Sequence, residues 1–309
     1  MLKLQEITLD KKEEINRFLH RKCSQNSEFT FTNLFMWRKS YDIKYVILND
    51  TLCIMPQHTG GPRSATFPIG FIREDGSECD IKPIIEMLLK DCRECGREPL
   101  LRLYDDRTVE KLVSAFPGKF LITEDVNYFD YVYRVEDLIN LSGKKYHGKK
   151  NHINKFKRAY QWEYQPINAE NAEECIALFD KWCREKSEEI EGVEEEREAV
   201  LELFHNWDAL DVRGGCIRVG GKMAAFSVGE PLCGKMAVIH LEHADVNYEG
   251  AFAIMNQQFL EHEWQNFELV NREEDMGIPG MRKAKESYRP VFMVKKYVAT
   301  LMPEGLGDV

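Results

Sequence analysis

A run of five polar or charged residues near the C-terminus offers the clearest chemistry in this sequence. It follows an apolar strand expected over residues 267–270 and consists of Asn271, Arg272, Glu273, Glu274 and Asp275. A short basic helix comes next and carries Arg282, Lys283, Lys285 and Tyr288. Ligands of α/β sheets bind where strands end and helices begin, so these residues form a candidate site. A solvated strand end followed by an ordinary surface helix is the alternative interpretation.

A basic stretch in the middle of the chain is the second candidate. Residues 138–162 contain no Asp or Glu, but they contain Lys144, Lys145, Lys149, Lys150, Lys155, Lys157 and Arg158. Tyr146, Ile153, Phe156 and Tyr160 fall close to one face of a helix, which we expect to dock on a domain. The outward charge is then a candidate site for phosphates, a tRNA backbone or anionic lipid head groups. A solvated linker helix with lysines that serve solubility is the alternative.

Length and composition limit the classes of protein. A chain of 309 residues favours two domains, and a net charge of −10 argues against general affinity for nucleic acid. No apolar run approaches the ~20 residues that span a bilayer, and the first residues lack a signal-peptide core. Nine cysteines without framework spacing indicate reduced thiols. We therefore expect a cytoplasmic protein without a transmembrane segment.

The two halves of the sequence share one order of elements. Apolar strands flank the turn Asn49-Asp50 in the first half and the turn Gly220-Gly221 in the second, which is a hairpin pattern. A helix, a strand, a short helix and a last apolar strand pair follow each hairpin, and the pattern recurs after about 170 positions. This order predicts an α+β fold in which each half has a mixed, mostly antiparallel sheet flanked by helices.

Two long stretches carry a resemblance to a known family. YHGKKNHINKFKRAY, NREEDMGIPGMRKAKESYRPV and the segment TFTNLFMWR at residues 30–38 resemble bacterial proteins grouped with the C-terminal domain of phosphatidylglycerol lysyltransferases. The resemblance covers nearly the whole chain and implies two tandem domains of the acyl-CoA N-acyltransferase (GNAT) fold. We expect these domains at residues 1–137 and 165–309, joined by a basic linker helix at 138–164. The second domain would carry the site.

The resemblance also implies roles for particular residues. The strand at 235–243 would be the central strand that splays to admit the donor, with His240 and Glu242 on one side of its pleat. Either side chain would accept the proton of an attacking amine or hydroxyl. Tyr288 would protonate the leaving group, or simply pack the short helix on the sheet. For substrate binding, the resemblance points to Asn271, Arg272, Glu273, Asp275, Arg282 and Lys283. The carboxylates among them would bind an α-amino group, or form salt bridges with the neighbouring cations.

The expected donor loop departs from the acetyl-CoA pattern. In acetyl-CoA enzymes of this fold the loop is rich in glycine and basic, and it cradles pyrophosphate at a helix N-terminus. Residues 245–250, which include Tyr248, offer Gly250 and the two acids Asp245 and Glu249 instead. This departure favours a different donor, namely aminoacyl-tRNA.

We therefore expect a soluble transferase that moves an aminoacyl or acyl group to an amine or hydroxyl acceptor, for instance a lipid head group. Aminoacyl-tRNA or acyl-CoA would be the donor, with no further cofactor and no metal. The basic linker would contact tRNA, and any contact with anionic lipid would be peripheral. An acetyl-CoA-dependent N-acetyltransferase is the second hypothesis. A non-catalytic binding module on the same scaffold is the third.

Overall fold

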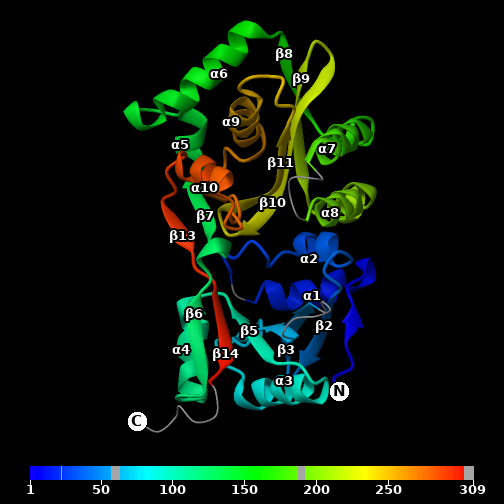
Figure 1. Cartoon of the computed structure of the whole chain (residues 1–309), viewed down its shortest axis with the longest axis vertical. Helices are drawn as coiled ribbons and strands as arrows, with labels where there is room; N and C mark the ends of the chain where they lie inside the picture. The colour runs from blue at the N-terminus through cyan, green and yellow to red at the C-terminus, as the bar shows by residue number, and fades with distance from the viewer. Residues whose placement is uncertain (22, 57–62, 187–191, 303–309) are drawn as a thin grey trace. The chain divides into compact units, whose positions relative to one another are not determined.

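The computed structural model describes residues 1–21, 23–56, 63–186 and 192–302 (Figure 1). They divide into two compact units, of which the first comprises residues 1–129 with the chain from residue 294 onward, and the second comprises residues 130–293. This division differs from the expected boundaries in three ways. Residues 130–137, expected in the first domain, belong to the second unit. The basic helix also belongs to the second unit, and the last strand belongs to the first.

The first unit contains two sheets. A three-stranded sheet has the order β1-β2-β3, and a four-stranded sheet has the order β4-β5-β14-β6. The strands are β1 (Gln5–Glu6), β2 (Ile43–Leu48), β3 (Thr51–Pro56), β4 (Arg63–Thr66), β5 (Pro99–Leu103), β6 (Phe120–Glu124) and β14 (Tyr297–Leu301). The helices are η1 (Leu9–Lys11), α1 (Lys12–Leu19), α2 (Phe31–Trp37), α3 (Lys82–Glu94), α4 (Asp106–Ala115) and η2 (Val126–Tyr128). Strands β4 and β5 are parallel, while β14 is antiparallel to both of its neighbours.

The second unit is built on one seven-stranded sheet, with the order β13-β7-β12-β11-β10-β9-β8. Its strands are β7 (Asp130–Arg134), β8 (Trp162–Pro166), β9 (Arg213–Val219), β10 (Lys222–Cys233), β11 (Met236–Ala244), β12 (Leu269–Asn271) and β13 (Phe292–Val294). Helices α5 (Val135–Asn140), α6 (His147–Ala159), α9 (Ala251–Glu263) and α10 (Pro279–Glu286) lie on one side of it (Figure 1). Helices α7 (Ala172–Lys186) and α8 (Val193–His205) cover the other side. Two short 3-10 helices complete the unit, η3 (Lys144–Tyr146) and η4 (Trp207–Ala209).

Both predicted hairpins are present. Asn49 and Asp50 have φ values of 45° and 60°, and Gly220 and Gly221 have φ values of 55° and 80°. Two consecutive residues with positive φ define the hairpin turn whose twist matches that of its flanking strands. The expected mixed, mostly antiparallel sheet is present in each unit, since the parallel pairs β4–β5 and β11–β12 lie among antiparallel neighbours. The first unit has a second, antiparallel sheet that was not expected.

The last strand of each half pairs outside that half. β14 hydrogen-bonds between β5 and β6 in the first unit, whereas β7 pairs with β12 in the second. The sequence pattern predicted these strands but not their partners. An apolar strand shows which of its faces is buried, but its local pattern does not specify the sheet that accepts its backbone hydrogen bonds.

The parallel strands β11 and β12 separate after a short pairing. Their register runs from Met236 opposite Leu269 to Val238 opposite Asn271. β12 ends there, while β11 continues to Ala244. The backbone pairing of the two strands therefore stops partway along β11, as the expected splaying requires. We call this break in strand pairing the opening; side chains of the following loop fill it, since Arg272 and Glu273 contact Glu242 and His240 on β11.

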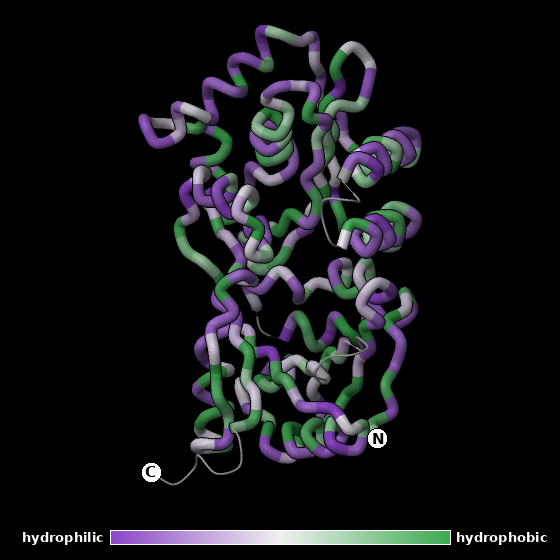
Figure 2. The backbone as a smooth tube through the Cα atoms, in the orientation of Figure 1, coloured by the Kyte–Doolittle hydropathy of each residue, from purple (hydrophilic) through white to green (hydrophobic). Residues whose placement is uncertain are grey.

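Two further expectations can be compared with the described residues. Seven cysteines carry free thiols as expected, namely Cys53, Cys79, Cys92, Cys95, Cys175, Cys183 and Cys216. Cys23 and Cys233 are disulfide-bonded, so the expectation of reduced thiols is wrong at these two positions. Within the described ranges, no helix combines the length and the apolar character that crossing a bilayer requires. Figure 2 shows α6 mainly in hydrophilic colours, in contrast to the strands at the centre of the second unit.

Candidate active site

The loop that follows β12 is fixed by its own polar side chains. Asn271 is buried, and its amide donates to Asp130 Oδ2 at 2.9 Å. Its Oδ1 accepts a hydrogen bond from the backbone N–H of Glu273 at 2.7 Å. Glu273 has a φ of 57°, in the left-handed region that few side chains adopt. Asn271, expected to bind substrate, thus stabilises a sharp bend directly after the strand.

Asp275 anchors the far end of the same loop. It accepts hydrogen bonds from Arg282 Nε and Nη2 at 2.7 and 2.8 Å, from the Tyr131 hydroxyl at 2.5 Å and from Gly277 N at 2.8 Å. Burial alone would raise its pKa, but the bonds from Arg282 and Tyr131 outweigh burial and lower the pKa to about 2. Asp275 and Arg282 therefore form a paired anchor, which is the salt-bridge alternative left open by the sequence. Lys283 lies exposed on α10.

Lys285 holds the loop from the α10 side. Its ammonium group donates to the carbonyl oxygen of Arg272 at 2.6 Å and also to that of Glu274. Burial lowers its pKa, because the charge is removed from water. Sequence reasoning assigned no role to this lysine. A side chain that binds backbone carbonyl groups leaves no periodic pattern in the sequence, and a lysine in a basic helix is usually solvated.

His240 is buried between two carboxylates. Nδ1 lies 2.8 Å from Glu273 Oε1, and Nε2 lies 2.8 Å from Glu230 Oε1. Burial lowers the pKa of the imidazole, but the hydrogen bonds to Glu230 and Glu273 outweigh it and raise the pKa to about 10. A doubly protonated ring has no lone pair with which to accept a proton. This geometry is at odds with the expected role as a base and makes His240 a residue that positions the loop.

Glu242 and Arg272 form a mostly buried ion pair in the opening beside β11. Arg272 Nη2 donates to Glu242 Oε1 at 2.7 Å, and Asn256 on α9 donates to Glu242 Oε2 at 3.2 Å. The two side chains of the pair are 10% and 16% exposed. Asn256 was not predicted. A polar residue inside the otherwise apolar stretch of α9 was the available signal.

Tyr288 packs its ring against the guanidinium of Arg272, whose Cζ lies 4.8 Å from the ring centroid. Tyr133 on β7 meets the same ring edge-on, with centroids 6.4 Å apart. Burial raises the pKa of the Tyr288 phenol, so the group keeps its proton and can donate it. Both interpretations of Tyr288 fit this geometry, since the side chain packs the sheet and also lies in the opening.

The basic residues between positions 144 and 158 differ in their surroundings: Lys149 is partly buried in the second unit, and the others form an exposed outer face. Tyr146, Ile153 and Phe156 are buried in the core of the second unit, which confirms the expected docking face. Lys149 Nζ lies 3.9 Å from the centroid of the Tyr288 ring. Burial, with the nearby charge of Arg272, lowers the pKa of Lys149 to about 8. The other basic residues are exposed, namely Lys144, Lys145, Lys150, Lys155, Lys157 and Arg158.

The expected donor loop is closely packed where α9 begins. Gly250 has a φ of 91°, and a Cβ there would lie 2.7 Å from the backbone oxygen of His152 on α6. The acid Glu249 pairs with Lys155 at 2.5 Å, and the ring of Tyr248 meets that of Tyr160 with centroids 5.4 Å apart. Helix α6 thus occupies the space beside the start of α9. This packing strengthens the sequence argument against pyrophosphate at that helix N-terminus.

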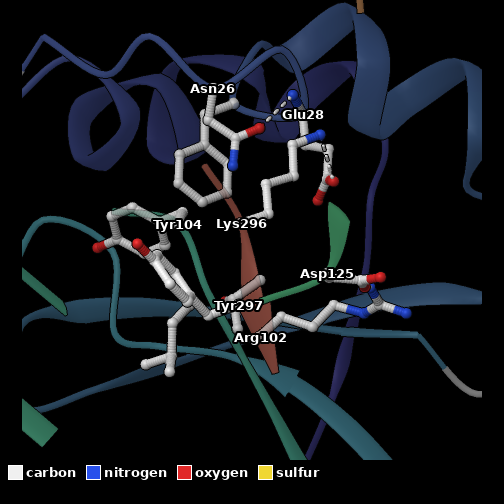
Figure 3. A pocket seen from close by; sticks show the side chains of 10 residues that line it. Asn26, Glu28, Arg102, Tyr104, Asp125, Lys296 and Tyr297 are labelled. Atoms are coloured by element: carbon white, nitrogen blue, oxygen red, sulfur yellow. Dashed lines mark hydrogen bonds and ion pairs between the residues drawn. The ribbon is translucent and has the colours of Figure 1, made fainter. Parts of the chain in front are cut away.

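A pocket in the first unit lies at the corresponding end of the parallel pair β4–β5 (Figure 3). Its charged side chains face one another. Lys296 Nζ lies 3.0 Å from Glu28 Oε1, and Arg102 Nη1 lies 3.8 Å from Asp125 Oδ2. Burial raises the pKa of Asp125. These charges are balanced within the pocket, in contrast to the opening in the second unit, where Lys149 and Arg272 accompany one carboxylate.

Among the described residues, no group of His, Cys, Asp or Glu side chains is arranged to hold a metal ion. The polar groups gathered around β11 are the cations Lys149 and Arg272, the phenol of Tyr288 and the carboxylate of Glu242. Such a set suits proton transfer and the binding of anions.

The family model described as phosphatidylglycerol lysyltransferase, C-terminal, matches residues 21–300. The chain belongs to this family. The resemblance carried by the two signature stretches is therefore confirmed, and the chain is related to a family of transferases. Among curated proteins, an uncharacterised protein of Mycoplasmoides gallisepticum is 24% identical over 180 residues. That match covers 56% of this chain and 56% of the relative, so it spans little more than half of either protein.

Solved structures agree with the family. A conserved protein of unknown function from Bacteroides thetaiotaomicron is 34% identical with a TM-score of 0.88, over 98% of this chain and 100% of that one. L-PGS from Bacillus licheniformis is 17% identical with a TM-score of 0.62, over 95% and 93% of the two chains. A tandem GNAT protein from the clavulanic acid biosynthesis pathway is 10% identical with a TM-score of 0.52, over 97% and 98%. The last two likenesses show the fold, which is GNAT-like.

Proposed function

We propose that the second unit is the centre of an aminoacyltransferase, which moves an aminoacyl group from aminoacyl-tRNA to a hydroxyl or amine acceptor. The observation that carries this proposal is the cluster of Glu242, Arg272 and Tyr288 where the parallel strands β11 and β12 separate. Membership of the phosphatidylglycerol lysyltransferase C-terminal family supports the reaction class. We take each unit to be a GNAT-like domain and the protein to act in the cytoplasm.

In this mechanism the acceptor hydroxyl or amine attacks the ester carbonyl of the aminoacyl group. Glu242 accepts the proton of the attacking group as the new bond to the carbonyl carbon forms. Tyr288 gives its proton to the ribose oxygen as the carbon–oxygen bond of the ester breaks. The proton held by Glu242 then returns to the tyrosine through solvent, so atoms and charge balance. Arg272 orients Glu242, and His240 with Lys285 fixes the loop that carries Arg272.

The outer face of α6 provides the surface for the tRNA. Together with the exposed lysines of η3, its exposed lysines and Arg158 extend from residue 144 to residue 158, on a chain that is acidic as a whole. Phosphate contacts by lysine and arginine give affinity that falls steeply with salt concentration. The acceptor is either an amine or the hydroxyl of a lipid head group, as the family name suggests for its lysyltransferase members.

Binding of charged and uncharged tRNA across a series of salt concentrations tests this proposal, with acetyl-CoA binding measured in parallel. We expect salt-sensitive binding with a preference for charged tRNA, and no saturable binding of acetyl-CoA. Saturable binding of acetyl-CoA without binding of tRNA would replace the aminoacyltransferase with an N-acetyltransferase. Failure to bind either molecule would favour a non-catalytic module.

A further inference from the structure

Phe252 is an exposed aromatic residue in the first turn of α9. It is 44% exposed, whereas its neighbours Ala251, Ala253 and Ile254 are buried in the core of the second unit. A single exposed apolar side chain is common on a protein surface, so its meaning depends on what lies around it.

On one side, Phe252 adjoins the polar groups of the opening. It precedes Asn256 by four residues, so the two side chains leave the same face of α9. Asn256 is buried and donates to Glu242 Oε2 at 3.2 Å. Phe252 therefore lies one turn of helix, roughly 6 Å along the axis, from the residue that holds the carboxylate of Glu242.

On the other side, the basic helix α6 lies against the start of α9. Lys155 on α6 pairs at 2.5 Å with Glu249, three residues before Phe252. A Cβ on Gly250 would lie 2.7 Å from the backbone oxygen of His152, also on α6. The exposed ring thus stands between a positively charged surface, which attracts polyanions, and the polar groups around β11.

We propose that Phe252 is a stacking platform for an unpaired base at the 3′ end of the tRNA. This inference rests on the proposed transfer function, and it names the part of the donor that α9 binds. The aminoacyl ester is attached at that end of the tRNA, so the bases next to the ester lie near Glu242 when the ester does. Every base has a π face, so stacking on an exposed ring needs no particular sequence.

A membrane is the other partner that an exposed apolar side chain beside lysines could fit. Binding to a membrane interface grows with the apolar area that enters it, whereas Phe252 offers one ring, which matches the face of one base. Its position one turn before Asn256 also favours the tRNA end, because the reacting end of the donor must come to Glu242.

Binding of two forms of tRNA tests the platform without an assay of transfer. One tRNA is intact, and the other has the unpaired nucleotides of its 3′ end removed. The variants are Phe252→Ala, the conservative Phe252→Tyr and the control Val246→Ala, which shortens a 70% exposed apolar side chain in the loop before α9. Alanine favours helix, so thermal unfolding is expected to show that Phe252→Ala is folded.

We expect Phe252→Ala to weaken binding of the intact tRNA by about tenfold, and Phe252→Tyr and Val246→Ala to weaken it less than about twofold. The loss is expected to be equal at low and high salt, because stacking releases no phosphate counterions. It is expected to disappear with the trimmed tRNA, which lacks the stacked base. These two features separate the ring from the lysines of α6.

An equal loss for intact and trimmed tRNA, or no loss for either, would overturn the platform and leave the transfer function standing. Loss of binding to vesicles of phosphatidylglycerol and phosphatidylcholine, with tRNA binding unchanged, would overturn it in favour of a membrane contact. No binding of tRNA by the wild type would overturn both proposals. Phe252-dependent binding of intact tRNA by a protein that transfers no label to any acceptor would overturn the transfer function alone.

Discussion

Glu242, Arg272 and Tyr288 come from three different elements, and the state of each depends on the others. Arg272 donates to the carboxylate of Glu242 through one arm of its guanidinium, and its Cζ lies 4.8 Å from the centroid of the Tyr288 ring. Three neighbouring residues that the sequence suggested as catalytic or substrate-binding support this cluster instead. The side chains of His240, Asn271 and Asp275 form hydrogen bonds with other groups of the protein.

Lys149 is predicted to be a reactive amine at moderately alkaline pH. With a pKa of about 8, about half of its amino groups are unprotonated at pH 8, compared with well under about 1% for a lysine at the ordinary value of 10.5. The groups that face it are Arg272, Glu242 and the Tyr288 ring. Acetylation by a water-soluble reagent, followed by mass spectrometry across pH 6–10, would give half-maximal labelling near pH 8. Half-maximal labelling above pH 10, as for a solvated lysine, would contradict the prediction that Lys149 lies in a partly buried site beside Arg272.

His240 is predicted to stabilise the protein most at neutral and acidic pH. Its pKa of about 10 in the folded state lies above the ordinary value of 6.5, so the stabilisation is complete below pH 6.5 and is lost as the pH rises through 10. His240→Gln leaves Glu230 and Glu273 without their cation, and it is expected to lower the free energy of unfolding by about 3 kcal/mol or more at pH 6.

Urea unfolding at pH 6 and pH 10 measures this effect, because the difference between wild type and His240→Gln is expected to shrink at the higher pH. Lys235→Gln, at an exposed ion pair on the β10–β11 turn, is the control and is expected to change stability little. A difference for His240→Gln that is independent of pH would show that the imidazole is not the charged partner.

At the scale of elements, the sequence predicted where helices and strands lie in the chain better than it predicted what their side chains do. Hairpins and helices followed from turn residues and periodicity, because those signals are local. The splaying of the central strand was implied by the family resemblance. The basic helix was also foreseen, with its apolar face inward. Local patterns could not distinguish Lys149 from Lys150, since the separation depends on the rotation of α6 against the residues that follow β12. They also could not show that Asp275 is paired within the loop, because that bond closes only after folding.

The basic segment formed by η3 and α6 is predicted to set the salt dependence of tRNA binding. Replacing the exposed Lys144, Lys150 and Lys157 with glutamine removes up to three phosphate contacts. The slope of log affinity against log salt is then expected to become shallower by about 2 to 3. Filter binding between 50 and 300 mM salt would measure it, with Lys235→Gln as a control far from α6 in the chain. An unchanged slope in the triple variant would place the tRNA elsewhere.

At the scale of the whole molecule, each unit takes a strand from the other half of the sequence: β7 pairs in the second unit and β14 in the first. This exchange of strands determines which fragment of the chain can fold. The second unit needs β7, α5 and α6, because Tyr133, Leu138 and Phe156 from these elements lie in its core. A fragment of residues 130–293 is therefore predicted to unfold cooperatively, while residues 165–309, the boundary suggested by the sequence, lack part of the sheet and core. Circular dichroism and thermal unfolding of the two fragments would compare them. A stable, cooperative 165–309 fragment would contradict the importance of the exchange.

The pairing partners of the exchanged strands are also the part of the fold that the sequence did not predict. Every strand involved was recognisable, and the family resemblance supplied the GNAT-like fold, now supported by the family model and by solved structures. The pairing of β7 with β12 and of β14 with β5 is a choice among similar apolar strands far apart in the chain. That choice depends on the whole assembly of the core.

Single-turnover transfer from labelled aminoacyl-tRNA tests the central claim most directly. Wild-type protein is mixed with charged tRNA and acceptor lipid, and label is followed from the tRNA into the lipid fraction. We predict transfer that falls by about 100-fold in Glu242→Gln and Tyr288→Phe. Thermal unfolding checks that both variants are folded, because Glu242→Gln leaves the Arg272 cation without its ion-pair partner and is expected to lower stability. Glu194→Gln, at an exposed acid on α8, is expected to transfer like the wild type. Transfer at the wild-type rate by both site variants, or label that stays on the tRNA with amine and lipid acceptors alike, would contradict an aminoacyltransferase centre beside β11.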